Sequence, residues 1–462
     1  MGQTLEGREP ELQVQSMQKI NHLSERDFLK IFFLYLSLSF IIGAFFMPDR
    51  AHMLTGYYEI LHNPTLGGTN FFDIGGYAAT FLNMGLVGLI CTGLFCIPGN
   101  KSNHAATLVT ILTTGFGAWG IHPLNMWPTF AGVMFYCLLR RRKIGDYTNA
   151  MLFSTGLAPF FSELMIRYPQ AEVMGFSASG ILVALLVGLF VGFFLPAGLD
   201  NAPKIHKGFA LYSAALPVGM IAFFMQGFLY RAMGVTVPTN ISDPSVGSAR
   251  IVNIFCIVFF SVCILVSLLM RVHLKTYWSM LTHHSHVIDF AAHYGNAIML
   301  LNVGLYGLFI LAYFNIIGVT FNAVLFGSVF CMLSTCNSGS HPFNSIPIIA
   351  GYVGADKLFQ LISPLTGGTF TQYLNSQSIA VGICYANGLS PLVSQYGWWF
   401  GAIAAFLHFC MVTTVPQLHG GMCLYNGGFT AAMVCLLIIP MLEHHFRTKH
   451  ERKQHRLSKR EQ

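Results

Sequence analysis

The chain has 462 residues, of which 54% are hydrophobic, 14% aromatic and only 9% charged, and its mean hydropathy is +0.58. A soluble domain has about 25% charged residues, so this chain has too few to cover a water-facing surface. The composition also excludes a disordered chain and indicates an integral membrane protein. The net charge of +7 does not predict nucleic-acid binding, because the basic residues cluster in loops and in the C-terminal tail.

Apolar runs predict two sets of seven membrane segments, separated by a polar stretch at 231–250. Residues 290–442 contain only two charged side chains, those of Asp356 and Lys357, which no soluble fold of that size could have. Several segments are short or interrupted by Gly and Pro, which predicts broken or re-entrant helices. The predicted segments are 28–47, 71–97, 104–120, 123–139, 148–166, 174–196, 208–230, 251–270, 287–314, 319–337, 342–358, 374–395, 397–416 and 420–442.

Four short motifs occur twice in the same order, which indicates an internal duplication. An Asn-x-Gly-Leu-x-Gly motif and a His-Pro-x-Asn motif recur at one shared offset, and a Gly-Leu-x-Pro-x-x-Ser motif follows after 13 extra residues in the second half. The matched residues are Asn83 with Asn302 and His122 with His341 at an offset of 219, Pro159 with Pro391 at 232, and His206 with His419 at 213. We therefore divide the chain into an N-terminal segment (1–27), membrane repeat 1 (28–235), membrane repeat 2 (248–444) and a basic tail (445–462).

An odd number of segments per repeat predicts that the second copy is inverted relative to the first. The loop charges support this, because the basic loop at 140–143 has only Lys357 as its counterpart in the second copy. Counting loops gives nine basic residues on one side and five on the other, before the tail is added to the first side. The positive-inside rule then predicts that both termini are cytoplasmic.

The His-Pro-x-Asn motif is suited to a helix break inside the membrane. Pro123 and Pro342 cannot donate the helical hydrogen bond, and each pushes the preceding histidine out of the α region. The asparagine can both donate and accept hydrogen bonds. We predict a central binding site where the two repeats meet; the alternative is a helix kink with locally satisfied polar groups. The predicted site residues are His122, Asn125, His341 and Asn344.

The Gly-Leu-x-Pro-x-x-Ser motif predicts a second interrupted segment in each repeat. Ser162 and Ser394 could satisfy the backbone groups freed by the proline, and the residues that follow them are Glu163 and Gln395. A buried carboxylate in one repeat only is what a proton- or cation-coupling site would look like. The alternative is an ion pair with Arg167, four residues on.

A histidine and a tyrosine precede the last segment of each repeat. His206 lies six residues before Tyr212, and His419 lies six residues before Tyr425. Such residues could line a pore, and a neutral histidine could donate or accept hydrogen bonds there. The alternative is that they are ordinary residues of the membrane boundary.

The order of these motifs resembles each half of the urea transporters, which are duplicated, inverted, channel-like membrane proteins. The similarity rests on the Asn-x-Gly-Leu-x-Gly motif, on the helix start from Gly120 to Asn125, and on the segment from Pro159 to Ser162. The chain differs from that family in its His-Pro dipeptide and in lacking a Leu-Pro-x-x-Thr-x-Pro signature. The whole chain resembles more closely an uncharacterised family of duplicated bacterial membrane proteins with no assigned function.

We therefore expect an all-α integral membrane protein of the bacterial inner membrane that moves a small polar, neutral or weakly ionised solute. Its partners would be this solute and the lipid bilayer, and self-association into a homo-oligomer stays open. One alternative is transport coupled to H⁺ or Na⁺ through Glu163, and another is a membrane-embedded enzyme that acts on a lipid. No nucleotide-binding or hydrolase motif is present, so we expect no enzymatic activity, metal or cofactor.

Inversion predicts that Arg142 and Lys357 lie on opposite sides of the membrane, because they occupy matching loops of the two repeats. We expect the R142C variant to react with a membrane-impermeant thiol reagent only from the cytoplasmic side, and the K357C variant only from the other side. The parent chain, which has eleven cysteines, provides the background. Reaction of both positions from the same side would contradict the inverted arrangement.

Overall fold

The computed structural model describes residues 24–100, 102–170, 172–173, 175–283 and 286–459, and their regular secondary structure is helical throughout. Most of the predicted N-terminal segment and residues 460–462 of the predicted tail lie outside this range. Seven helices are long and apolar enough to cross a membrane, which together with the composition indicates a multi-pass membrane protein. They are α2 (Glu25–Phe45), α5 (Gly76–Leu94), α10 (Ala178–Ile205), α11 (Ala215–Gln226) with its π-helical continuation to Ala232, α12 (Ala249–Leu269), α15 (Asn296–Ile317) and α22 (Asn426–His445).

The two halves of the chain contain corresponding helices in the same order. Between the long helices of the first half lie α3 (Met53–His62), α4 (Phe71–Ile74), α6 (His104–Phe116), α7 (Pro123–Leu139), α8 (Thr148–Ser154) and α9 (Ala158–Ile166). The second half has α13 (Leu274–Leu281), α14 (Phe290–Tyr294), α16 (Ala323–Leu333), α17 (Pro342–Ile362), α18 (Gln377–Ala386), α19 (Ser390–Gln395), α20 (Trp398–Val412) and α21 (Val415–Leu418), and α23 (Lys449–Ser458) follows α22.

Corresponding helices also pack in corresponding pairs. Helix α2 packs on α5 as α12 packs on α15, and α7 packs on α10 as α17 packs on α20. Small residues allow the second kind of contact: a Cβ on Gly132 would lie 1.9 Å from the carbonyl oxygen of Gly188, and one on Gly351 would lie 2.2 Å from that of Ala402. Close backbone approach of this kind is how helices associate in a bilayer.

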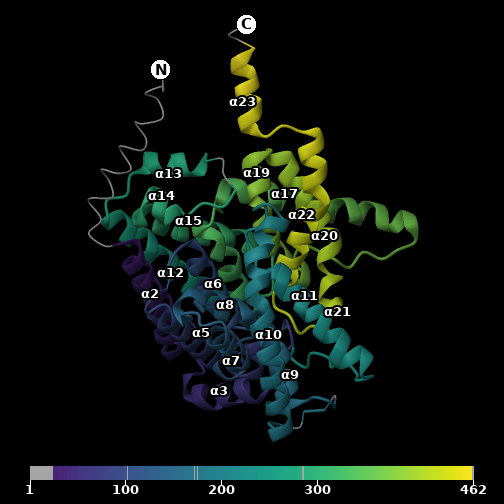
Figure 1. Ribbon diagram of the computed structural model, residues 1–462. Coiled ribbons are helices and arrows are strands. Elements are labelled where there is room, and N and C mark those ends of the chain that lie inside the picture. The colour runs from purple at the N-terminus through teal and green to yellow at the C-terminus, as the bar shows by residue number, and fades with distance from the viewer. Residues whose placement is uncertain (1–23, 101, 171, 174, 284–285, 460–462) are drawn as a thin grey trace.

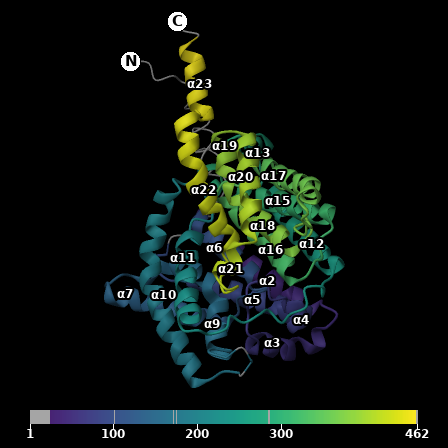
Figure 2. The ribbon, with the colours of Figure 1, turned by 90° about the vertical axis from the view of Figure 1, so that its right-hand side faces the viewer.

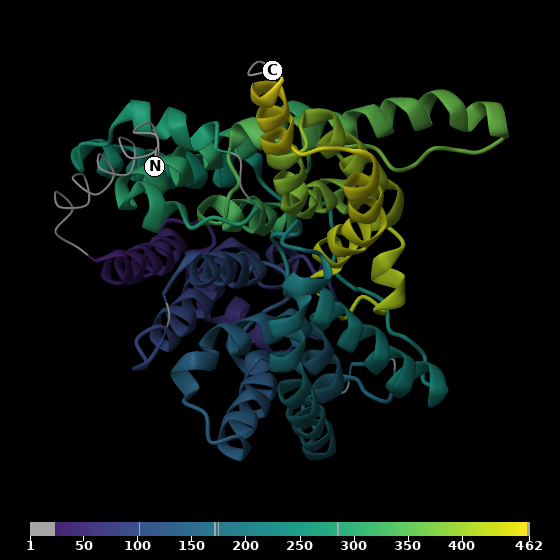
Figure 3. The same ribbon diagram turned by 45° about the horizontal axis from the view of Figure 1, so that its top comes forward.

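Corresponding elements lie at opposite ends of the molecule. Figures 1 and 2 place α3 and α9 toward the lower end, whereas their counterparts α13 and α19 lie at the upper end. Figure 3 shows the first half below and the second half above, meeting along one interface. Helix α6 of the first half packs on α16 of the second, and α11 packs on α22, so the equivalent helices of the two halves contact each other at this interface.

Two of the predicted segments are broken at equivalent places. The segment at 148–166 consists of α8, a 3₁₀ turn at Thr155–Leu157 and α9, and the segment at 374–395 consists of α18, a 3₁₀ turn at Asn387–Leu389 and α19. Both α9 and α19 carry proline in their first turn, where a missing backbone N–H costs nothing. The 13 extra residues of the second half fall within the stretch that includes the end of α17 and the loop after it, which protrudes to the right in Figure 1.

The amide side chains of Asn83 and Asn302 fix the start of α7 and α17 in the same way. Asn83 Nδ2 donates to the carbonyl oxygens of Gly117 (2.6 Å) and Ile121 (2.8 Å). Asn302 Nδ2 donates to the equivalent carbonyls of Cys336 (2.8 Å) and Ser340 (2.9 Å). These carbonyls precede the His-Pro dipeptide and lie beyond the ends of α6 and α16, so the asparagine side chains supply donors to them inside the membrane.

We predict that N83A lowers the free energy of unfolding by about 1–3 kcal/mol, because two buried carbonyls lose their donor. The measurement is the thermal unfolding midpoint of the protein in detergent. Asn253 provides a control, since in the described part of the chain its side-chain amide bonds to Asn315 alone, at an exposed position (2.9 Å). Equal losses for N83A and N253A would contradict the assigned role.

Candidate functional site

Each His-Pro motif begins a helix that its own asparagine caps. Asn125 Oδ1 accepts from the backbone N–H of His122 (3.0 Å), and Asn125 Nδ2 donates to the carbonyl of Gly120 (3.0 Å). In the second repeat Asn344 makes the same two contacts, with the N–H of His341 (3.0 Å) and the carbonyl of Gly339 (2.8 Å). All four motif side chains are buried. The asparagines thus pair the backbone groups that the break in the helix leaves free.

In the first repeat the structure brings three predicted site residues together. Asn125 Nδ2 lies 3.0 Å from Ser162 Oγ, and Ser162 Oγ lies 3.3 Å from His122 Nε2. Ser162 comes from α9, so this small network joins α9 to the start of α7. His122 Nδ1 is buried and has no hydrogen-bond partner among the described residues.

In the second repeat different residues form the corresponding network. Ser345 Oγ donates to the carbonyl of His341 (3.0 Å) and to Asn387 Oδ1 (2.6 Å), and Tyr306 Oη lies 2.9 Å from Ser345 Oγ. The sequence analysis did not single out Ser345 or Asn387, because neither is part of a repeated motif. Ser394 is buried in α19, and Gln395 ends that helix.

Among the described residues, the hydrogen bonds of each motif stay within one repeat. Those of His122 and Asn125 connect to the first repeat, and those of His341 and Asn344 connect to the second. The motifs therefore hold together the interior of each repeat, and their convergence on one shared cavity stays a prediction.

Glu163 forms a buried ion pair with Arg167. Arg167 Nε and Nη2 lie 2.7 and 2.6 Å from the two carboxylate oxygens, and the two side chains are 0% and 4% exposed. Arg167 Nη1 also donates to the carbonyl of Thr239 (3.3 Å). At the offset of 232 the counterparts of the pair are Gln395 and Trp399, so the second repeat lacks both charges. A buried bidentate pair that is present or absent as a unit fits a structural role.

The segments that carry His206 and Tyr212, and His419 and Tyr425, exchange contacts between the repeats. The N–H of Leu211 donates to the carbonyl of Gly388 (2.9 Å), and the N–H of Leu424 donates to the carbonyl of Gly156 (2.8 Å). Leu211 corresponds to Leu424 at the offset of 213, and Gly156 corresponds to Gly388 at 232. Each repeat therefore donates one backbone hydrogen bond to the other repeat and accepts the equivalent bond from it.

The two tyrosines fill the centre of this interface. A Cβ on Gly388 would touch the ring of Tyr212 at 2.6 Å, and one on Gly156 would touch the ring of Tyr425 at 2.7 Å, so only glycine fits beneath either ring. The two rings line a central cavity of about 10 Å³, which is at the lower limit of the space that one water molecule needs. The other residues around it are Leu108, Leu112, Phe153, Ala214, Ala215, Tyr385 and Gly428.

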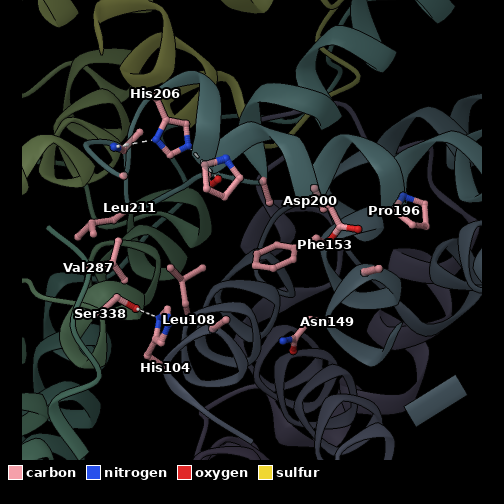
Figure 4. Close-up of a pocket in the computed structure, with 18 of the residues that line it drawn as sticks. His104, Leu108, Asn149, Phe153, Pro196, Asp200, His206, Leu211, Val287 and Ser338 are labelled. Carbon is pink, nitrogen blue, oxygen red and sulfur yellow. Dashed lines mark hydrogen bonds between the residues drawn. The ribbon is translucent and has the colours of Figure 1, made fainter. Parts of the chain in front are cut away.

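The histidines of these segments are buried beside polar partners. His206 Nε2 lies 2.8 Å from Ser213 Oγ, and His419 Nδ1 lies 2.5 Å from Asn426 Oδ1. Ser213 and Asn426 correspond to each other at the offset of 213. His206 lies at the edge of a larger cavity, which Figure 4 shows in close-up.

This larger cavity, here called the α8 vestibule, has a volume of about 480 Å³. Its lining combines apolar and polar side chains, and Leu108, Phe153 and Ala214 belong to both this vestibule and the central cavity. Its polar or ionisable lining residues are His104, Asp146, Tyr147, Asn149, Asp200, His206, Ser213 and Ser338 (Figure 4).

A second vestibule of about 220 Å³, here called the α18 vestibule, has an equivalent lining in the second repeat. Asn149 of the first vestibule corresponds to Val381 of the second, Phe153 to Tyr385 and Pro203 to Pro416. Tyr385 also lines the central cavity. The sequence analysis missed these residues. The signal that could have found them was the offset of 232, which matches Phe153 of the first repeat to Tyr385 of the second.

The comparisons with known proteins identify a family but no activity. Residues 49–231 and 270–444 match a family described as "Protein of unknown function (DUF1576)", with one stretch in each half of the chain. The chain belongs to this family. No curated protein and no solved structure matches it. The two matched stretches are consistent with the duplication that the repeated motifs predict.

We predict that E163Q and R167Q each lower the free energy of unfolding by about 3–5 kcal/mol, because each leaves one charge buried without its partner. The double variant E163Q/R167Q should lose much less than the sum of the two single variants. Unfolding in detergent, followed for all four proteins, gives the coupling energy. An E163Q variant as stable as the parent would contradict the structural role and favour a titrating carboxylate.

Proposed function

We propose that this protein transports a small polar, neutral or weakly ionised solute along the interface between its two repeats. The observation that carries the proposal is the series of three cavities. The small central cavity shares Leu108, Phe153 and Ala214 with the α8 vestibule and Tyr385 with the α18 vestibule. Solute would enter the α8 vestibule, pass the central tyrosines and leave through the α18 vestibule, or travel in reverse.

The proposal includes an inverted arrangement of the repeats about a two-fold axis in the membrane plane. The reciprocal contacts of Leu211 with Gly388 and of Leu424 with Gly156 support it, since only a two-fold relation makes both contacts equivalent. An axis in the membrane plane is proposed because each repeat has an odd number of predicted membrane segments, which inverts the second copy relative to the first.

We infer that both ends of the membrane domain face the cytoplasm. Glu25 at the start of α2 lies close to Asp289, whose Oδ2 accepts from the N–H of His104 beside the α8 vestibule (2.6 Å). At the end of α22, Glu443 pairs with Lys207, which follows His206 of the same vestibule. The basic loop at 140–143 precedes Asp146, also on this vestibule, so the positive-inside rule makes the α8 vestibule face the cytoplasm.

The lining of the vestibules supports the proposed solute class. Among the described residues the α8 vestibule is lined by no Lys or Arg, and the α18 vestibule is lined by no charged side chain at all. An anion would lack a partner there, and a cation would leave the two carboxylates of Asp146 and Asp200 for an uncharged vestibule. A neutral polar molecule loses the least free energy along such a path.

Coupling to H⁺ or Na⁺ through Glu163 has less support. The Glu163 carboxylate is held at both oxygens by Arg167, and the pair lines none of the three cavities. No described contact favours the third hypothesis, a lipid-modifying enzyme. Passive or exchange transport is therefore the form of the proposal that the geometry supports best.

The proposal predicts that the purified protein makes lipid vesicles permeable to at least one of water, glycerol, formamide and urea. Light scattering after an osmotic step measures this permeability, with protein-free vesicles as the reference. In a C96S/C410S background, which removes the two exposed cysteines, N149C should lose the permeability after reaction with a charged methanethiosulfonate. Asn149 lines the α8 vestibule, whereas N201C, at an exposed asparagine outside the lining, should keep it.

Permeability no higher than that of protein-free vesicles for all four solutes would contradict the proposal. Equal inhibition of N149C and N201C would place the path outside the vestibule.

A further inference from the structure

The two central tyrosines occupy equivalent places but make different hydrogen bonds. Tyr212 Oη carries one proton and donates it to the carbonyl oxygen of Cys331 (2.8 Å) in α16, while the carbonyl oxygen of Cys384 in α18 also lies within hydrogen-bond distance (3.2 Å). Tyr425 Oη is buried and has no hydrogen-bond partner among the described residues. The ring positions over Gly388 and Gly156 are matched, so the difference lies in the hydroxyl contacts.

The repeat offsets identify the contacts that Tyr425 lacks. At 219 residues Cys331 corresponds to Leu112 in α6, and at 232 residues Cys384 corresponds to Leu152 in α8. Leu112 lies in the last part of α6 and Leu152 near the end of α8, as Cys331 and Cys384 lie near the ends of α16 and α18. A two-fold symmetric molecule would have Tyr425 Oη bound to both, and this structure does not.

The unequal hydroxyl contacts agree with the unequal vestibules. The α18 vestibule, on the helices that Tyr212 binds, has a volume of about 220 Å³, and Val324 of α16 and Gln377 of α18 are in its lining. The α8 vestibule, on the helices that Tyr425 leaves unbound, has a volume of about 480 Å³. The smaller vestibule is therefore the one whose helices bind a tyrosine hydroxyl, and the larger vestibule is the one whose helices bind none.

We propose that Tyr212 and Tyr425 are alternating locks, which make the protein a carrier with two states in which the two repeats exchange roles. This inference rests on the proposed transport along the repeat interface. In the state described here the Tyr212 lock is closed and the α8 vestibule is open. In the opposite state Tyr425 Oη lies within hydrogen-bond distance of the carbonyls of Leu112 and Leu152, Tyr212 Oη is released, and the α18 vestibule becomes the wider one.

The symmetry of the other contacts explains why the locks can exchange at little cost. The backbone bonds of Leu211 with Gly388 and of Leu424 with Gly156 are both formed here, so they are available in both states. Exchange replaces one pair of tyrosine–carbonyl contacts by an equivalent pair. The central cavity of about 10 Å³ is too small to connect the two vestibules. A carrier requires this separation, whereas an open channel does not.

Matched cysteines in the two vestibules test the locks directly. Asn149 and Val381 are equivalent, both are partly exposed, and each lines one vestibule. In the C96S/C410S background, N149C and V381C are each combined with Y212F or Y425F. The rate of reaction with a charged methanethiosulfonate, applied to both sides of the membrane, reports how open each vestibule is.

We expect Y212F to raise the labelling rate of V381C relative to that of N149C by about five-fold, the ratio that corresponds to one net hydrogen bond. Y425F should leave this ratio unchanged or lower it, because its hydroxyl contributes only to the opposite state. The variant Y212F/Y425F should return the ratio toward that of the parent. Since both variants remove one hydroxyl from equivalent rings, each is the folding control of the other.

An unchanged ratio in Y212F, or equal effects of Y212F and Y425F, would overturn the alternating locks. The labelling assay needs no transported solute, so it separates this inference from the proposed function. Vesicles that conduct solute while the ratio stays fixed would mean a channel without locks. If Y212F and Y425F change the labelling ratio as expected but the protein conducts none of the four solutes, the locks stand and the proposed solute class is overturned.

Discussion

The interior of this protein depends on one constraint: a backbone polar group that leaves a helix inside the membrane must find another partner within the protein. The breaks before α7, α9, α17 and α19 free several such groups. Within each repeat, asparagine side chains pair the groups before the His-Pro dipeptides. Between repeats, the carbonyls of Gly156 and Gly388 are paired by the N–H groups of Leu424 and Leu211. The same pairs hold the central tyrosines in place and so define the path that we propose.

The sequence predicted the parts of the fold that depend on composition and repetition. An all-helical membrane protein follows from the sparse charge, and the structure has helices within all fourteen predicted segments. The breaks at 155–157 and 387–389 follow from the Gly and Pro of a repeated motif. The extension of α17 to Ile362 was missed, because the apolar pattern weakens at Asp356 and Lys357 while the helix continues.

The candidate site could be predicted only in part, because a repeated polar motif looks the same in the sequence whether its side chains line a path or pair with the backbone. His122, Asn125 and Ser162 do contact one another, but they do so inside one repeat. Tyr212 and Tyr425 were predicted and lie at the centre, whereas their neighbours Phe153 and Tyr385 were not. Apolar and aromatic residues carry no chemical signature, so only the fold reveals that they surround a cavity.

The central claim is that the two vestibules open to opposite sides of the membrane. The most direct measurement is the side from which N149C and V381C react with a membrane-impermeant thiol reagent in oriented vesicles. The account predicts that N149C reacts only from the cytoplasmic side and V381C only from the other side, since the two residues occupy equivalent positions of the repeats that we propose to be inverted. Reaction of both from one side would contradict the inverted repeats and the path between them.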